Sequence, residues 1–252
     1  MNSVKYSILF FLMFLLFGCD SKNAWDCVQT PGTGVVFQES VEQFHSITIQ
    51  GHMDVVLVQD TLTQIKVETR ENLADNIHFS ITDGLLFIEE DSSCNILKDR
   101  SYTTIYIHAP ELRSIRNAST GTIRNEGIWV QDKMALISEN HFDSAYYNNG
   151  VFDMHLEVGD LSVLANGNSL FQLEGTAEKA DISFYSGSAR LEAKTMQIQE
   201  LEVYHRGYNH MLVFPVQAIR GEILNTGDVR AYNLPPIVEV DEKYRGSLIF
   251  VE

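Results

Sequence analysis

The chain of 252 residues carries 34 Asp and Glu against 18 Lys and Arg, so its formal net charge is −16. This acidic balance, without a basic cluster that has interleaved aromatic residues, excludes nucleic acid and anionic membrane headgroups as expected partners. The eight histidines and three cysteines lack metal-ligand spacings such as His-x-His or Cys-x-x-Cys, so we expect no metal site and no cofactor.

Residues 1–18 are expected to be a lipoprotein signal peptide. After Lys5, residues 8–17 form an unbroken apolar run of ten, which is too short to span a bilayer but suits an export signal. The run ends in Leu-Phe-Gly-Cys, which resembles the bacterial lipobox and implies cleavage before Cys19 and lipid on its thiol. We therefore expect a protein held to the cell envelope, at the outer membrane, by lipid on Cys19. The alternative is an ordinary signal peptide followed by a chance cysteine.

Residues 19–34 are polar and include Pro31 and two glycines, so we expect a lipidated tether. Beyond Cys19 the chain has two further cysteines, Cys27 and Cys94. In an oxidising envelope they would form a disulfide that pins the tether to the first folded segment. Two unpaired thiols are an equally compatible alternative.

Residues 35–110 are expected to form an N-terminal β segment. Ile65 and Val67 alternate with polar residues, as in a strand with one buried face. Asp83-Gly84 lies between two apolar runs and is a hairpin signal. No stretch shows a long apolar pattern with the period of a helix, so the sequence predicts an all-β protein.

Residues 111–252 are expected to wind into the coils of a β-solenoid. Five glycines recur with residue numbers that differ by 20, 20, 20 and 19, and the fourth position after each is apolar. Short strands reset by a glycine at constant spacing indicate stacked coils of about 20 residues. The alternative is a meander of antiparallel hairpins with Asn-Gly turns. The five glycines are Gly167, Gly187, Gly207, Gly227 and Gly246.

A coil of this size cannot bury its inward side chains alone, so it has to stack on its neighbours. Strands of adjacent coils would then pair in parallel, ~4.8 Å apart. We expect glycine at the corners because it reaches positive φ without steric cost.

Motifs along nearly the whole chain resemble those of one known family. The motifs are, in chain order, Ile47-x-Ile49-x-Gly51-x-x-Asp54-Val55-x-Leu57, Val67-Glu68-x-x-Glu71-Asn72-Leu73, Asp83-Gly84-x-Leu86-x-Ile88 and Pro110-x-Leu112-x-x-Ile115. Together with the Ser-Gly-Ser type of corner further on, they resemble the putative auto-transporter adhesin, head GIN-domain family. The resemblance implies a right-handed parallel β-helix, one continuous domain over residues 35–252, and a lipoprotein of Bacteroidetes type to which no catalytic residues are assigned.

The sequence contains no recognisable catalytic constellation, and we expect no enzyme. Nucleophile-elbow, Walker and dinucleotide-binding patterns are absent. Carboxylates on the outer faces of the strands are interpreted as solvated residues, although a pair in a groove would suit a carbohydrate-active enzyme. The outer charged residues are Asp153, Glu157, Asp160, Glu174, Arg190, Glu192, Glu202 and Asp228.

Four tyrosines near the coil corners form the candidate binding patch: Tyr146, Tyr147, Tyr204 and Tyr208. We therefore hypothesise a non-enzymatic binding or adhesion module with a glycan or protein ligand. A structural or sensory envelope component is the first alternative, and a carbohydrate-active enzyme is the second. The oligomeric state is left open.

Overall fold

The computed structural model describes residues 32–91, 102–141 and 143–251. The predicted signal peptide and the three cysteines Cys19, Cys27 and Cys94 lie outside these ranges. The described chain is all-β, as predicted, with 17 strands in one curled sheet and a 3-10 helix at Ala74–Asn76. Within these ranges, no helix has the length and apolarity needed to cross a membrane.

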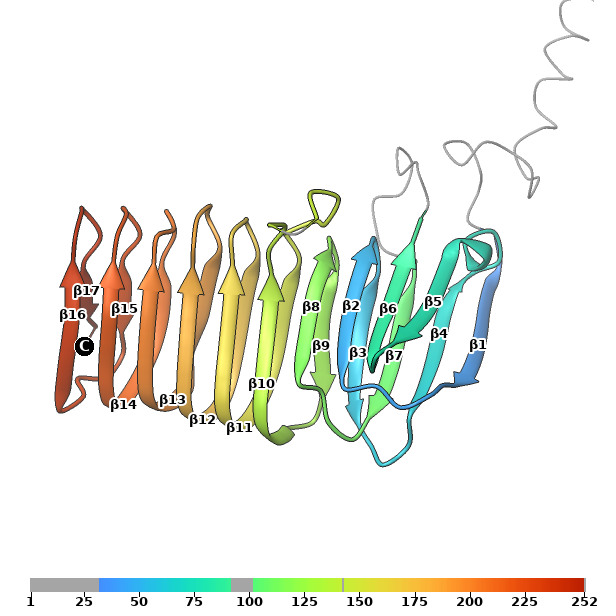
Figure 1. Cartoon of the computed structure of the whole chain (residues 1–252), viewed down its shortest axis with the longest axis horizontal. Helices are drawn as coiled ribbons and strands as arrows, with labels where there is room; N and C mark the ends of the chain where they lie inside the picture. The colour runs from blue at the N-terminus through green and yellow to red at the C-terminus, as the bar shows by residue number, and fades with distance from the viewer. Residues whose placement is uncertain (1–31, 92–101, 142, 252) are drawn as a thin grey trace, which may run out of the picture.

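The strands form a row from β1 at one end to β16 and β17 at the other (Figure 1). The first nine are β1 (Gly34–Ser40), β2 (Ser46–Gly51), β3 (Asp54–Gln59), β4 (Gln64–Arg70), β5 (Ile77–Thr82), β6 (Leu85–Glu90), β7 (Thr104–Ala109), β8 (Ser114–Ser119) and β9 (Thr122–Glu126). The others are β10 (Trp129–Ser138), β11 (Val151–Ala165), β12 (Leu170–Phe184), β13 (Arg190–His205), β14 (Met211–Ile223), β15 (Val229–Ala231), β16 (Ile237–Glu242) and β17 (Leu248–Phe250).

The N-terminal strands mix parallel and antiparallel pairing. Strand β4 is antiparallel to β1 and β7, and β5 and β6 form the predicted hairpin, with positive φ at Asp83 and Gly84. By contrast, β2 is parallel to β6 and β8, and β3 is parallel to β7 and β9. The parallel stack therefore already includes residues of the N-terminal β segment.

From β10 onwards all neighbouring strands are parallel, which rules out the antiparallel meander. One column of paired residues shows the repeat: Phe152, Phe171, Leu191, Met211, Val229 and Leu248. Their residue numbers differ by 19, 20, 20, 18 and 19, which confirms the predicted repeat length. From Phe171 to Met211, the paired residue is the fourth after the ladder glycine of its repeat. After Gly227 it is the second, Val229, because the preceding repeat is short.

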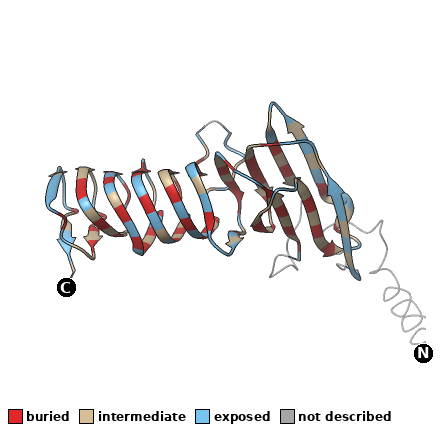
Figure 2. Cartoon of the chain, turned by 90° about the horizontal axis from the view of Figure 1, so that it is seen from below, coloured by how far each residue is buried: buried red, intermediate tan, exposed pale blue. Residues whose placement is uncertain are grey.

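Each long strand curls back on itself. Phe171 and Phe184 lie near the two ends of β12, yet their ring centroids are only 5.7 Å apart. A straight strand over that distance in sequence would separate them by about 40 Å. Phe171 also stacks on Phe152 of the preceding strand, with centroids 4.9 Å apart. Alternate residues therefore point into one shared core, visible as red bands along the strands (Figure 2).

The glycine corners are places of close backbone approach. A Cβ added to Gly187 would lie 2.3 Å from the carbonyl oxygen of Gly167, and one on Gly246 would lie 2.1 Å from that of Gly227. Among the five glycines of the ladder, only Gly187 has positive φ, at 80°. The expectation that glycine stands at all five corners because it adopts positive φ is therefore wrong. At most of these corners a side chain would clash with the backbone of the neighbouring repeat.

Candidate functional site

One corner of the stack is much longer than the others. The corners at 185–189 and 206–210 have five residues each, whereas the corner between β10 and β11 covers residues 139–150. Beside it lies a pocket of about 620 Å³. Its lining residues are Arg116, Ile137, Glu139, His141, Leu164, Asn166, Tyr185 and Ser186.

The floor of the pocket is the outer face of the parallel strands. Ile137 of β10 pairs in register with Leu164 of β11 on one side and with Arg116 of β8 on the other. Their chain neighbours Leu136 and Val163 are fully buried in the core, so Ile137 and Leu164 point outward by strand alternation. Carbon makes up most of the pocket's exposed lining. The site is therefore an apolar floor with a few polar groups at its edges.

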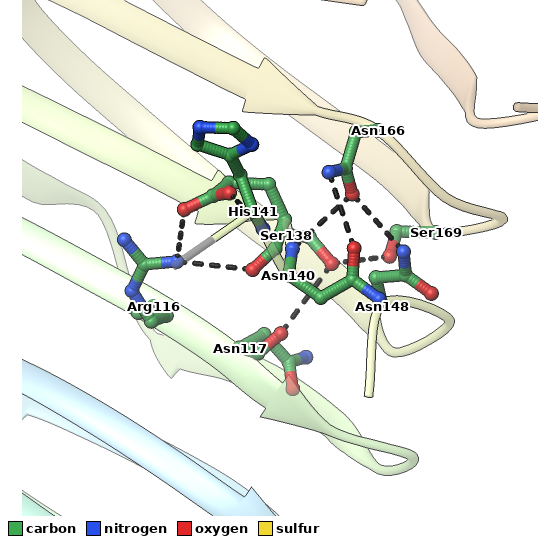
Figure 3. Close-up of polar contacts among 9 residues, drawn as sticks. Arg116, Asn117, Ser138, Asn140, His141, Asn148, Asn166 and Ser169 are labelled. Carbon is green, nitrogen blue, oxygen red and sulfur yellow. Dashed lines mark hydrogen bonds and ion pairs between the residues drawn. The ribbon is translucent and has the colours of Figure 1, made fainter. Parts of the chain in front are cut away.

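The charged end of the pocket is an ion pair. Arg116 Nη1 lies 2.6 Å from Glu139 Oε1, and the two side chains are only 19% and 10% exposed. The same nitrogen donates to the backbone oxygen of Glu139 at 3.1 Å, and the backbone N–H of His141 donates to Glu139 Oε2 at 2.7 Å (Figure 3). The Tyr146 ring lies 5.7 Å from the Arg116 guanidinium. This pair, which has no net charge, joins the long corner to strand β8.

Asparagine side chains hold the long corner against the next corner of the stack. Asn166 Oδ1 accepts from Asn148 Nδ2 at 3.0 Å and from the backbone N–H of Asn140 at 3.3 Å, while Asn166 Nδ2 donates to Asn140 Oδ1 at 3.2 Å (Figure 3). Deeper in, the buried hydroxyls of Ser138 and Ser169 bond to each other. Asn166 also lines the pocket, so its contacts to Asn140 and Asn148 hold one of the lining residues in place.

The four tyrosines of the predicted patch contact different partners in the structure. Tyr146 and Tyr204 lie beside residues that line the pocket, because Tyr146 contacts Arg116 and Tyr204 packs on Tyr185 with ring centroids 5.3 Å apart. Tyr147 instead contacts His52, at 5.3 Å between centroids. Tyr208 is 63% exposed at the 206–210 corner.

Sequence reasoning missed Tyr185, which lines the pocket itself. A signal for it was present, since Tyr204 follows Tyr185 by about one repeat of the glycine ladder. The outward aliphatic floor gave no such signal, because Ile137 and Leu164 resemble core residues until the register is known.

Three of the seven outer carboxylates lie in ion pairs, and these are away from the pocket. The pairs are Lys133–Asp160 at 3.0 Å, Arg190–Glu192 at 2.7 Å and Arg230–Asp228 at 3.6 Å. Glu202 differs, because partial burial raises its pKa and the neighbouring Asp181 carboxylate adds to the effect, while Arg220 opposes it. In the described ranges, no group of three His, Cys, Asp or Glu is arranged to hold a metal ion.

His205 lies in the core beneath the 206–210 corner and is fully buried. Its Nε2 donates to the backbone oxygen of Asn209 at 2.8 Å, and its ring meets Phe184 edge-on. Burial lowers the pKa of this imidazole, because the charged form cannot be hydrated there. The Asp228 carboxylate acts against this shift and the His210 ring adds to it.

The parallel repeats and the resembling motifs agree with a direct comparison to known families. The family model described as putative auto-transporter adhesin, head GIN domain, matches residues 43–235. The chain belongs to this family. The resemblance found in the sequence is thereby confirmed over most of the chain.

Solved structures share the fold of this head GIN domain. A putative adhesin from Bacteroides fragilis NCTC 9343 has a TM-score of 0.77 at 20% identity, covering 87% of this chain and 97% of that one. A putative lipid binding protein from Parabacteroides distasonis ATCC 8503 has a TM-score of 0.60 at 17% identity, covering 88% and 98%. A putative adhesin from Parabacteroides merdae ATCC 43184 has a TM-score of 0.56 at 14% identity, covering 88% and 97%. A search of curated proteins found no match.

Proposed function

We propose that this head GIN domain is a lipid-anchored, non-enzymatic binding module of the cell envelope, and that the pocket beside residues 139–150 is its ligand site. The pocket carries the proposal. Its volume of about 620 Å³ falls in the range of small-molecule sites, roughly 300–1,000 Å³, which are mostly apolar and largely pre-formed. The family description as an adhesin and the lipobox at Cys19 support the envelope location.

The polar groups of the pocket favour binding over catalysis. Glu139 is engaged by Arg116 and by the backbone N–H of His141, so its oxygens already accept hydrogen bonds. A general base needs a lone pair directed at a substrate proton. The arrangement is suited to holding the long corner in place beside a ligand.

The finer description of the fold also belongs to the proposal. We propose that the repeats wind as a right-handed parallel β-helix over residues 111–252. Parallel strands in one sheet are connected by right-handed crossovers in about 98% of cases. An experimental electron-density map would test the handedness directly.

The test of the binding site uses the full chain held in phospholipid nanodiscs. It is incubated with arrays of glycans and of envelope lipids, alongside the variant Leu164→Trp, whose larger side chain occupies part of the pocket and covers its aliphatic floor. We expect binding to at least one class of probe and a loss of at least tenfold in the variant. Binding that is equal for both proteins on every probe would place the ligand elsewhere.

The lipid anchor has its own test. In cells expressing the full chain, Cys19→Ala is expected to move the protein from the membrane fraction to the soluble fraction and to remove incorporation of radiolabelled palmitate. A variant that keeps its membrane association and its label would contradict lipidation at Cys19.

A further inference from the structure

We propose that the pocket holds a neutral, single-chain amphiphile, with a hydrocarbon chain laid across Ile137 and Leu164 and an uncharged polar head beside Ser186. This inference rests on the proposed function, because it names the ligand class of the same pocket.

The two aliphatic residues of the pocket floor favour a hydrocarbon ligand over a sugar. Ile137 and Leu164 are branched aliphatic side chains without hydrogen-bonding groups, and they lie side by side in register. A sugar placed on them would lose the hydrogen bonds that its hydroxyls make to water, with no replacement from the floor. A methylene chain has no such loss, and it gains from leaving water.

The shape of the floor favours an elongated ligand. Its residues come from β8, β10 and β11 and from the corner that follows β12, which are successive neighbours in the sheet. Three strand spacings of ~4.8 Å give a floor of roughly 14 Å from Arg116 to Tyr185. An extended acyl chain of medium length can lie across the strands over this distance.

Charge opposes an anionic head. Among the lining residues Arg116 is the one Lys or Arg, and its guanidinium already binds Glu139 at 2.6 Å in a largely buried pair. A fatty acid carboxylate would have to displace Glu139 and leave that carboxylate buried without its partner. The formal charge of the chain, −16, further opposes an anion.

An uncharged polar head finds partners at the opposite end. The Ser186 hydroxyl donates to the backbone oxygen of Asn166 at 3.0 Å, so its proton is used while its oxygen can accept. Ser186 is exposed and adjoins Tyr185, whose ring forms the wall at that end. A glycerol or alcohol hydroxyl would donate to this oxygen.

Photo-crosslinking with the full chain in phosphatidylcholine nanodiscs tests the ligand class. Three diazirine probes are compared: 1-decanoylglycerol, decanoate and a glucoside without an acyl chain. Crosslinked peptides are located by mass spectrometry in the wild type, in Leu164→Trp and in Leu212→Trp. Leu212 is the matched control, because it is also a partly buried leucine, paired with Glu192 and Arg230 outside the pocket.

We expect decanoylglycerol to label peptides containing Ile137 or Leu164 at least tenfold more than decanoate does. Leu164→Trp should reduce this labelling at least tenfold, and Leu212→Trp should leave it unchanged. Pocket labelling by decanoate or by the glucoside at an equal or higher level would overturn the neutral amphiphile while keeping the pocket as a binding site. No pocket labelling by any of the three probes would overturn both.

Discussion

The short corners and the long corner occupy the same place in successive repeats, but they differ in length and in their close contacts. At 185–189, glycine backbones approach so closely that a side chain has no room, since a Cβ on Gly187 would lie 2.3 Å from the oxygen of Gly167. Side-chain hydrogen bonds link the short corners too, such as Ser188 to Asn168. The corner at 139–150 adds the largely buried Arg116–Glu139 pair to the asparagine contacts of Asn166. The strands on both sides keep their parallel register. A repeat can therefore carry a pocket beside one long corner without disturbing the core beneath it.

The largest expected loss of stability comes from a substitution at the glycine of a short corner. Gly187→Ala places a Cβ 2.3 Å from the oxygen of Gly167 at a positive φ of 80°, so the backbone must move. We expect the free energy of unfolding to fall by about 3 kcal/mol, combining strain and lost contacts. Urea denaturation followed by fluorescence of the buried Trp129 measures the change.

Gly127→Ala is the matched control for that experiment. Gly127 also has positive φ, at 67°, but no atom lies within 4 Å of an added Cβ. Only the dihedral cost remains, about 1 kcal/mol. Equal losses in the two variants would show that close approach is not what the ladder glycines provide.

The next effect loosens the long corner. Asn166→Ala removes the contacts to Asn140 and Asn148, and we expect a loss of about 1.5 kcal/mol. Hydrogen exchange should accelerate at the amides of Tyr146 and Tyr147, while corner 206–210 stays protected. Asn225→Ala is the control, because its Nδ2 makes one exposed bond, to Arg206. Unchanged exchange at the tyrosines would mean that the asparagines do not hold the corner.

A smaller effect concerns pH at a short corner. Burial lowers the pKa of His205 in the folded protein, whereas an unfolded histidine has a pKa of about 6.5. Between the two pKa values, His205 is more protonated in the unfolded chain than in the folded protein. The contribution of His205 to the free energy of unfolding is therefore complete above pH ~6.5. It falls as the pH drops toward the pKa of the folded state, by at most about 1.4 kcal/mol per pH unit.

Urea titrations at pH 7.5 and pH 5 measure this slope. His205→Phe should reduce it, since no titrating group remains at that position. His155→Gln, at an exposed position on β11, is the matched control for the loss of a histidine. A slope that persists in His205→Phe would assign the pH dependence to other groups.

The smallest expected effect lies in the pocket. Leu164 points outward into the pocket, so Leu164→Trp should change the free energy of unfolding by no more than about 0.5 kcal/mol. The same urea experiment checks this. A loss above about 1.5 kcal/mol, which is typical of overpacking, would mean that the tryptophan disturbs the core. Ligand binding would then have to be tested with Ile137→Asn.

The repeat could be predicted from sequence because a core side chain and a corner glycine recur at nearly constant spacing. The pocket could not, because it depends on which residues of different strands become neighbours. Arg116 and Glu139 are far apart in sequence and gain meaning only through the pairing of β8 with β10. Tyr146 and Tyr147 are adjacent in the chain, yet their side chains diverge to different partners. The reason for the glycine ladder could not be predicted either. The backbone atoms that crowd each glycine belong to a neighbouring repeat, and the sequence of one repeat does not show which atoms those are.

The parallel strands lie side by side along the long axis of the molecule, so their ladder bonds run along that axis (Figure 1). A tensile load between the two ends of the row would pull these bonds open in sequence instead of shearing them all at once. Each opened repeat would release about 20 residues, or roughly 65 Å of extended chain. Under such a load the stack would lengthen in a series of similar steps, as an extensible spacer does.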